Sequence, residues 1–133
     1  MRFMMLMIPK GYEKAAPGTM PDAKAVATMM KYNESLQNAG VLLGLEGLHP
    51  PSMGARVSFA GGKPKVTDGP FIETKEQLGG VIILEVADLD EAMLWAERTP
   101  WNEDGCVTEI RPIMDYDAYA ARAATATGES AAS

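Results

Sequence analysis

The sequence is organised around the ten-residue stretch Asp68-Gly69-Pro70-Phe71-Ile72-Glu73-Thr74-Lys75-Glu76-Gln77, which lies between two segments typical of strands. Its first three residues form a turn signal, because Asp accepts hydrogen bonds from backbone N–H groups, Gly permits a positive φ and Pro fixes φ. An aromatic side chain and three further ionisable side chains follow. The stretch therefore predicts a bend between strands, with Phe71 inserted in the core.

The residues before this bend predict a β-hairpin. From residue 55 to 59 the side chains alternate in polarity, so that Val57 and Arg56 face opposite ways. Gly61-Gly62 supplies a tight turn, and residues 63–67 form the partner strand. The hairpin leads directly into the bend.

The rest of the chain predicts two helices and four further strands. The apolar runs place the strands at residues 3–8, 41–45, 81–86 and 106–114, and the helices at 21–39 and 88–100. Thr19 is the predicted cap of the first helix, and Gly40 is placed to end it. The predicted buried stripes are Val26, Met29, Met30, Asn33 and Leu36 in the first helix, and Leu89, Ala92, Met93 and Ala96 in the second.

The order of these elements is β-α-β, a hairpin insertion, then β-α-β. It predicts an α+β fold, a ferredoxin-like sandwich with both helices on one face of an antiparallel sheet. The strands at 3–8 and 81–86 are apolar at nearly every position, which indicates that both of their faces are covered. Two helices cover only one face. A second copy of the chain is expected to cover the other, which gives a homodimer.

Composition narrows the class of protein. The 133 residues predict one domain at 1–114, followed by a C-terminal extension at 115–133 that is partly disordered. The net charge of −6 argues against nucleic-acid partners. The lone Cys106 excludes an internal disulfide, and no apolar run is long enough to span a membrane. The short apolar N-terminus lacks a signal-peptide cleavage site, so we expect a cytoplasmic protein.

Several motifs together carry a resemblance to a known family. They are Pro50-Pro51, Gly54-Ala55-Arg56-Val57, Gly61-Gly62-Lys63, the pattern from Asp68 to Glu76, Gly79-Gly80 and the helix at 88–100. From Met1 to Met114 the chain resembles the YCII-related, or DGPF-domain, family of small α+β proteins. The resemblance implies the dimeric α+β-barrel superfamily, in which two ferredoxin-like sheets pack face to face.

The resemblance implies less about activity. The wider group contains suspected enzymes with a histidine–aspartate pair in a cleft, and a relative that removes chloride from a chlorinated aromatic. The superfamily includes cofactor-free monooxygenases and lactone isomerases, whereas the DGPF branch has no settled activity. His49 is the single histidine and lies in no motif that matches the catalytic pair of that relative. Dehydrochlorination is therefore not transferred to this chain.

Seven residues are candidates for a site between the sheet and the hairpin loop. His49 suits proton transfer near neutrality and lies in a rigid Pro-rich loop. The acid/base candidates are His49, Asp68 and Glu73, and the substrate-binding candidates are Arg56, Lys75, Phe71 and Glu76. No cluster has metal-ligand spacing and no cofactor motif is present, so we expect neither a metal nor a cofactor.

Each candidate also has a structural interpretation. Asp68 can simply shape the bend, and the charges at 73–76 can pair with one another on a solvated surface. Arg56 can pair with Asp68 or Glu73, and His49 can be a loop histidine without function. Two hypotheses remain open. The chain is a cofactor-independent enzyme acting by acid/base chemistry on a small anionic or aromatic molecule, or a non-catalytic small-molecule-binding or interaction module, accessory to transcription regulation.

Overall fold

The computed structural model describes residues 1–18, 20–69 and 78–127, and within them a four-stranded antiparallel sheet is the centre of the molecule. Its strands are β1 (Arg2–Ile8), β2 (Leu42–Gly47), β5 (Gly80–Glu85) and β6 (Val107–Pro112). The helices are α1 (Ala23–Asn38), α2 (Leu89–Glu97) and α3 (Tyr116–Thr127), with the short 3-10 turns η1 (Tyr12–Lys14) and η2 (Pro51–Met53). A separate hairpin is formed by β3 (Ala55–Ala60) and β4 (Lys63–Asp68).

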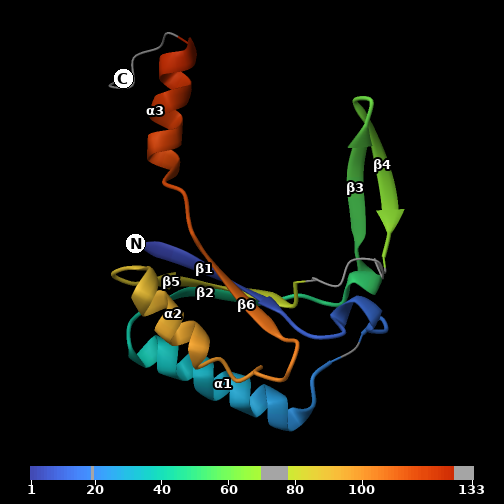
Figure 1. Cartoon of the computed structure of the whole chain (residues 1–133), viewed down its shortest axis with the longest axis vertical. Coiled ribbons are helices and arrows are strands. Elements are labelled where there is room, and N and C mark those ends of the chain that lie inside the picture. Colours follow the sequence, from blue (N-terminus) through green and yellow to red (C-terminus); the bar gives the residue numbers. More distant parts are fainter. Residues whose placement is uncertain (19, 70–77, 128–133) are drawn as a thin grey trace.

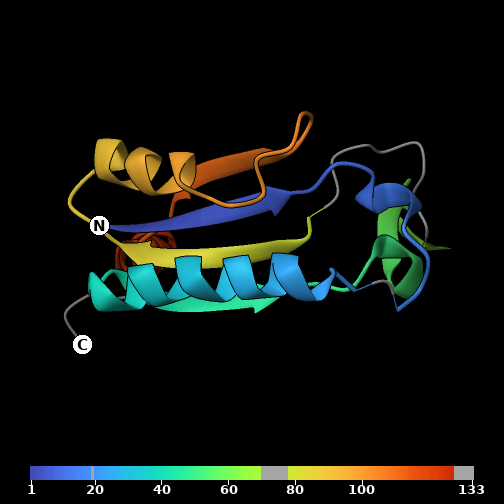
Figure 2. The same ribbon diagram turned by 90° about the horizontal axis from the view of Figure 1, so that it is seen from below.

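The topology confirms the predicted ferredoxin-like α+β sandwich. Without the hairpin, the elements follow one another as β1-α1-β2 and β5-α2-β6, and the strand order in the sheet is β2-β5-β1-β6. Both α1 and α2 lie on the same face of the sheet (Figures 1 and 2). The final strand β6 lies at the edge, as Pro112 at its end predicts.

The core lies between this face and the two helices. Alternate residues of the central strands are buried there, among them Phe3 and Met5 of β1 and Ile82 and Leu84 of β5. Leu36 of α1 and Ala92 of α2 close the layer from the helix side. At about 25 cal/mol per Å² of buried apolar surface, each of these large side chains contributes about 2 kcal/mol to folding.

A tyrosine connects the two helices. It is not among the residues predicted from the sequence to be buried. Tyr32 of α1 is 7% exposed, and its hydroxyl donates to the backbone carbonyl of Trp95 in α2 at 2.8 Å. Its ring packs edge-on against Trp95 and Trp101, with centroid distances of 6.5 and 5.8 Å. The prediction of Met30 and Met93 as core residues is wrong, because they are 65% and 41% exposed. Leu89, also expected inside, is 47% exposed.

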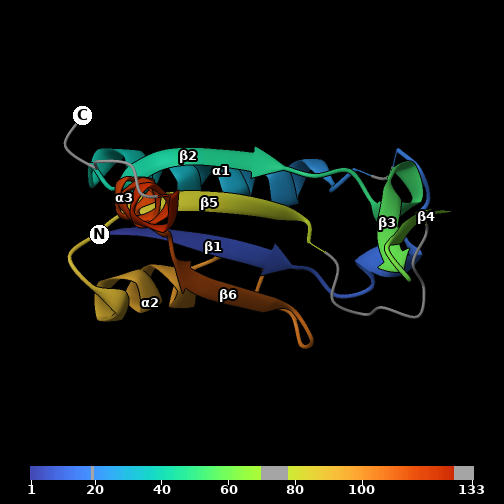
Figure 3. The ribbon, with the colours of Figure 1, turned by 90° about the horizontal axis from the view of Figure 1, so that it is seen from above.

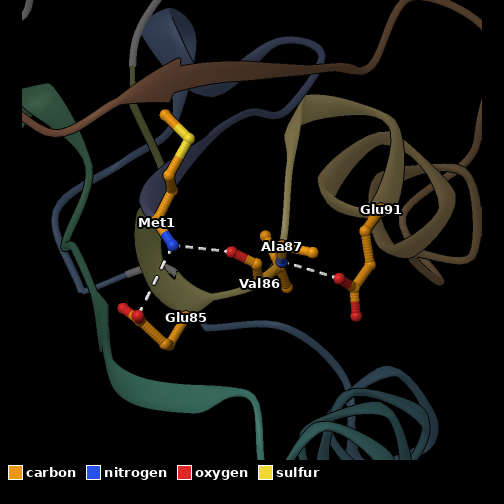
Figure 4. A network of polar contacts seen from close by, with 5 residues as sticks. All are labelled: Met1, Glu85, Val86, Ala87 and Glu91. Carbon is orange, nitrogen blue, oxygen red and sulfur yellow. Dashed lines mark hydrogen bonds and ion pairs between the residues drawn. The ribbon is translucent and has the colours of Figure 1, made fainter.

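Both helices that pack on the sheet begin at an aspartate cap. Asp88 caps α2 by accepting from the Glu91 N–H at 2.9 Å, and the Glu91 carboxylate accepts from the Ala87 N–H at 2.7 Å (Figure 4). In the same view the Met1 amino group donates to the Val86 carbonyl at 2.8 Å. Asp22 caps α1 by accepting from the Ala25 N–H at 2.7 Å. Thr19 lies outside the described residues.

The other face of the sheet carries apolar side chains without a helix layer above them. We call this the open face; its apolar residues are Met4, Leu6 and Ile8 of β1, Val81 and Ile83 of β5, and Val107 of β6. Figure 3 shows this face from above, with α1 and α2 behind the sheet. The absence of alternation in β1 and β5 thus has a structural meaning, because apolar residues lie on both faces.

Two projections rise from the ends of this open face. The β3-β4 hairpin stands beyond the ends of β1 and β2, and α3 stands at the opposite end of the strands (Figures 1 and 3). We call them the two arms. All residues of both hairpin strands are exposed, and so are Tyr116 and Tyr119 of α3, at 76% and 55%. The hairpin turn is made by Gly61 and Gly62, with φ of 57° and 77°, as predicted.

Candidate functional site

Four chain segments meet at the end of the sheet where β1 and β2 finish. They are residues 9–18, 48–54, 68–69 and 78–79, and we call their meeting point the loop junction. Backbone hydrogen bonds fix it: Gly79 donates to the Met7 carbonyl at 2.7 Å, Leu48 donates to the Gly79 carbonyl at 2.9 Å, and Gly69 donates to the Gly54 carbonyl at 2.9 Å. These bonds tie the base of the hairpin to the sheet.

Two glycines are required here by close contact. A Cβ on Gly69 would lie 1.7 Å from the Pro51 carbonyl oxygen, and a Cβ on Gly79 would lie 2.8 Å from Cγ of Pro9. Gly69 is not among the described glycines with positive φ. On the sequence alone, Gly69 is explained by a positive φ, and that explanation is wrong. Glycine is needed here because the backbone of residue 69 lies very close to η2, not because it is left-handed.

His49 and Asp68 both lie at this junction. His49 is exposed in the loop between β2 and η2, next to the fully buried Pro50, which anchors that loop. Asp68 is the exposed last residue of β4, opposite Ala55, and its neighbour Gly69 lies against η2. The fold thus brings together two loop segments that are about twenty positions apart in the chain.

Arg56 lies elsewhere on the hairpin. It is opposite Thr67 in the pairing of β3 with β4, whereas Asp68 is opposite Ala55. Since successive residues of a strand point to opposite faces, Arg56 and Asp68 occupy opposite faces of the ribbon. The predicted pairing of Arg56 with Asp68 is therefore disfavoured. Arg56 does face away from Val57 and Phe59, as the alternation predicts.

The remaining candidates fall in the stretch that the structure does not describe. These are Phe71, Glu73, Lys75 and Glu76. The bend at Pro70 and the insertion of Phe71 into the core also lie outside the described residues, which resume at Leu78.

Three polar residues of the junction have no counterpart among the predicted site residues. Tyr12 donates its hydroxyl hydrogen to the Leu48 carbonyl, and burial raises the pKa of its phenol above the usual value of 10.0. Glu13 is 7% exposed, and its Oε2 has no hydrogen-bond partner among the described residues. Within the same described part of the chain, the buried Oγ of Ser52 is also unpartnered.

No sequence pattern marks Glu13 in advance. It follows the break at Pro9-Lys10-Gly11, where the apolar run of β1 ends, and glutamate is rarely buried. The residue lies in η1, which packs against η2, a contact between segments far apart in the chain. The Pro50-Pro51 pair, which predicts a rigid loop, is the single signal pointing to that region.

Metal and membrane sites have no candidates in the described ranges. The side chains of residues 1–18, 20–69 and 78–127 form no group of three or more His, Cys, Asp or Glu suited to a metal ion. Over those ranges, none of the helices combines the length and apolar character that crossing a bilayer requires.

Proteins similar to this chain include a solved structure and an uncharacterised sequence. The structure is the 5-chloro-2-hydroxyhydroquinone dehydrochlorinase of Burkholderia phenoliruptrix AC1100, solved with 2,5-dihydroxybenzoquinone. It aligns with a TM-score of 0.48 at 15% identity over 86% of this chain and 94% of the other. The sequence is an uncharacterised protein of Rhizobium meliloti (strain 1021), 37% identical over 91 residues, or 68% of this chain and 70% of the relative.

A family model provides the assignment. The model of the YCII-related domain matches residues 1–117, which include the whole sheet, both packed helices, the hairpin and the loop junction. The Rhizobium relative supports the same assignment, since its similarity extends over two thirds of each chain. The chain therefore belongs to the YCII-related family.

Proposed function

We propose that this chain is a cofactor-independent enzyme that transfers a proton on a small anionic or aromatic molecule bound at the loop junction. The observation that carries the proposal is the meeting of the His49 and Asp68 segments at η2. An imidazole and a carboxylate on anchored loops are suited to acid/base catalysis. Membership of the YCII-related family is consistent with this class of activity and does not name a reaction.

His49 is the proposed acid/base group, because an imidazole is the side chain best suited to proton transfer near neutrality. Asp68 is its proposed partner, either orienting the imidazole or taking the second proton. Both side chains are exposed, so a ligand reaches them without local unfolding. Glu73, Lys75, Phe71 and Glu76 remain proposed site residues on sequence grounds alone. Arg56 would have to act from the other face of the hairpin ribbon.

The test is turnover by folded single variants. Purified protein is first screened against small phenols, hydroxylated quinones and 2-oxo acids for exchange or release of a carbon-bound proton. We expect His49→Ala and Asp68→Ala each to lower the rate at least about a hundredfold. Lys63→Ala, at the tip of the hairpin, is the control with an unchanged rate. If both variants keep the full rate on every converted substrate, the proposed roles are wrong.

A second candidate function is a non-catalytic binding or interaction module. The observation that favours it is the exposure of both His49 and Asp68, which general acids and bases in enclosed sites do not share. Such a module would bind a small molecule or a protein partner, such as a transcription regulator, without converting anything. Saturable ligand binding with no turnover, lost in the same two variants, would select this alternative over the enzyme.

We also propose that the protein is a homodimer joined through the open face. The four strands, up to seven residues long, give a face of about 20 by 20 Å, or about 400 Å². A stable interface needs about 800 Å² from each partner. The face alone is therefore too small, and the two arms would supply the remaining contact area.

The arms fit a second copy of the chain for a geometric reason. They stand at opposite ends of the strands, so the space between them is set by strand length (Figure 1). The sheet of a second copy has the same length. The hairpin also needs such a partner, because Val57, Phe59 and Val66 share one exposed apolar side and an isolated two-stranded ribbon is only marginally stable.

The cytoplasmic location remains a prediction.

A further inference from the structure

We infer that Glu13 and Ser52 form a polar subsite of the loop junction that binds a hydrogen-bond-donating group, a hydroxyl or an amine, of a small organic ligand. The inference rests on the proposed function, since it adds a binding determinant to the same junction as His49 and Asp68. It also narrows the ligand class, because it requires a donor group on the molecule and not only an anionic or aromatic character.

The unusual observation is a buried carboxylate with an unused acceptor atom. Glu13 is 7% exposed, and its Oε2 has no partner among the described residues. Burying a carboxylate oxygen without a hydrogen bond is unfavourable, and nearly all buried polar atoms in folded proteins are satisfied. An exception of this kind calls for a partner from outside the chain, and a bound group is the partner that we infer here.

The second observation is that a buried serine hydroxyl in the contacting turn also lacks a hydrogen bond. Ser52 lies in η2, which packs against η1, the turn that carries Glu13. Within the described part of the chain, the buried Oγ of Ser52 also lacks a hydrogen-bond partner. Two unsatisfied buried atoms in two contacting turns indicate one shared polar subsite.

The backbone around these two side chains is held in place on both sides. Before Glu13, the Tyr12 hydroxyl donates to the Leu48 carbonyl. After it, the Gly18 N–H donates to Sδ of Met53 at 3.2 Å. These two contacts attach the chain on either side of Glu13 to the chain on either side of Ser52. The subsite is therefore preorganised, which lowers the entropic cost of binding a ligand.

The chemistry of the two atoms selects the ligand group. An ionised carboxylate only accepts hydrogen bonds, whereas a serine hydroxyl both donates and accepts. A group that satisfies both must carry an N–H or O–H, as a phenol, an alcohol or an amine does. The Tyr12 hydroxyl does not compete for Glu13, because it is already bonded to Leu48. A ligand whose only polar group is a carboxylate would be repelled by Glu13.

The test uses the whole chain and three probes of matched size: hydroquinone and benzylamine as donors, and benzoate as an acceptor-only anion. Binding is measured by calorimetry for wild type, Glu13→Gln, Ser52→Ala and the control Glu34→Gln, an exposed glutamate of α1. We expect a donor probe to bind wild type more tightly than benzoate. Glu13→Gln should weaken that probe about tenfold or more, and Ser52→Ala less, while Glu34→Gln has no effect.

Thermal unfolding without ligand provides the second measurement. Because Oε2 of Glu13 has no hydrogen-bond partner among the described residues, Glu13→Gln should leave the unfolding midpoint unchanged or raise it. A midpoint lowered by more than about 5 °C together with unchanged probe binding would identify Glu13 as a structural residue and overturn the inference. Wild type that binds benzoate as tightly as both donor probes, or binds none of the three, would also overturn it.

The two proposals fail in different ways. If Glu13→Gln binds the donor probe normally while His49→Ala and Asp68→Ala lose turnover, the subsite is wrong and the proposed enzyme stands. If Glu13→Gln loses the probe while both of the other variants keep full turnover, the subsite stands and the roles assigned to His49 and Asp68 are wrong.

Discussion

Gly69 lies against Pro51 so closely that a methyl group on its Cα would come within 1.7 Å of the Pro51 carbonyl oxygen. The Gly69 N–H also donates to the Gly54 carbonyl at 2.9 Å. The base of the hairpin is therefore fastened to η2 by one hydrogen bond and one backbone contact that only glycine permits. This contact explains why an Asp-Gly pair follows β4, and it positions Asp68 beside the loop that carries His49.

We predict that Gly69→Ala destabilises the protein by about 1–3 kcal/mol, because the backbone of η2 or of the hairpin base must shift to admit the methyl group. Urea unfolding monitored by tryptophan fluorescence gives this value. Gly54→Ala, at the end of η2, is the matched control, since its Cβ would lie at an ordinary 3.6 Å from the same oxygen and its φ is −117°. Equal stability of the two variants would contradict the close-contact explanation.

The sequence predicts most of the fold because local signals agree with one another along the chain. Gly61-Gly62 specifies a hairpin turn whatever surrounds it, and the Asp88–Glu91 spacing specifies a helix start. The choice between Thr19 and Asp22 as the cap of α1 is different. Both side chains can accept the capping bond, so propensity alone does not distinguish them.

The predicted core stripes fail where tertiary packing sets the rotation of a helix. Met30 and Tyr32 are both plausible inward residues of α1, and periodicity favours Met30. The structure buries Tyr32 because its hydroxyl reaches the Trp95 carbonyl and its ring fits between two tryptophans. A long-range hydrogen bond of this kind leaves no trace in hydrophobic periodicity.

Tyr32→Phe should therefore cost about 1–2 kcal/mol, since the Trp95 carbonyl loses its 2.8 Å donor in a buried setting. Chemical denaturation at neutral pH measures the change in the free energy of unfolding. Tyr119→Phe, which alters a tyrosine of α3 that is 55% exposed, is the control and should change stability by less than about 0.5 kcal/mol. A Tyr32→Phe variant as stable as the control would remove the bridging role of this hydroxyl.

The same tyrosine predicts how stability depends on alkaline pH. Burial raises the pKa of Tyr32 from 10.0 to about 12, against an opposing effect of the Arg98 charge. The folded state thus holds this proton more tightly than the unfolded state does. The resulting stability is fully present below pH about 10 and is lost as pH rises towards about 12. Tyr32→Phe should flatten this part of the stability curve, whereas an unchanged slope would contradict the assignment.

The cap of α2 gives a separate stability prediction. Asp88→Ala removes the acceptor of the Glu91 N–H and should cost about 1 kcal/mol. Asp88→Asn keeps a side-chain oxygen acceptor and should recover most of the loss. Circular dichroism during thermal unfolding compares the three proteins. If the asparagine variant is as unstable as the alanine variant, charge and not the capping hydrogen bond stabilises this helix end.

The candidate site is less predictable than the fold, and the reason is visible in two residues. His49 is identifiable because its chemistry is unique in the chain and its loop is rigid. Glu13 is one of many acidic residues, and it is buried in η1, a turn that packs against η2. Tertiary contact therefore distinguishes this carboxylate from the others, and composition does not.

The proposed dimer makes the last prediction. Leu6 lies on the open face, paired across the sheet with Val81 on one side and Glu109 on the other. A second carboxylate directly opposite Glu109 would repel it and would lose its hydration when two copies associate. We expect Leu6→Glu to weaken self-association about a hundredfold or more and to give a folded monomer in sedimentation at micromolar concentration.

Two further variants test whether the dimer interface lies on the open face or on another surface. Met93→Glu places the same charge on α2, where the side chain is 41% exposed on the helix layer, and it should leave the dimer intact. Phe59→Glu changes a hairpin side chain that is 72% exposed, and it weakens association only if the arms contact the second copy. Wild type that sediments as a folded monomer would exclude the dimer altogether. A dimer that tolerates Leu6→Glu would place the interface away from the open face, and the apolar side chains of β1 and β5 would then need another explanation.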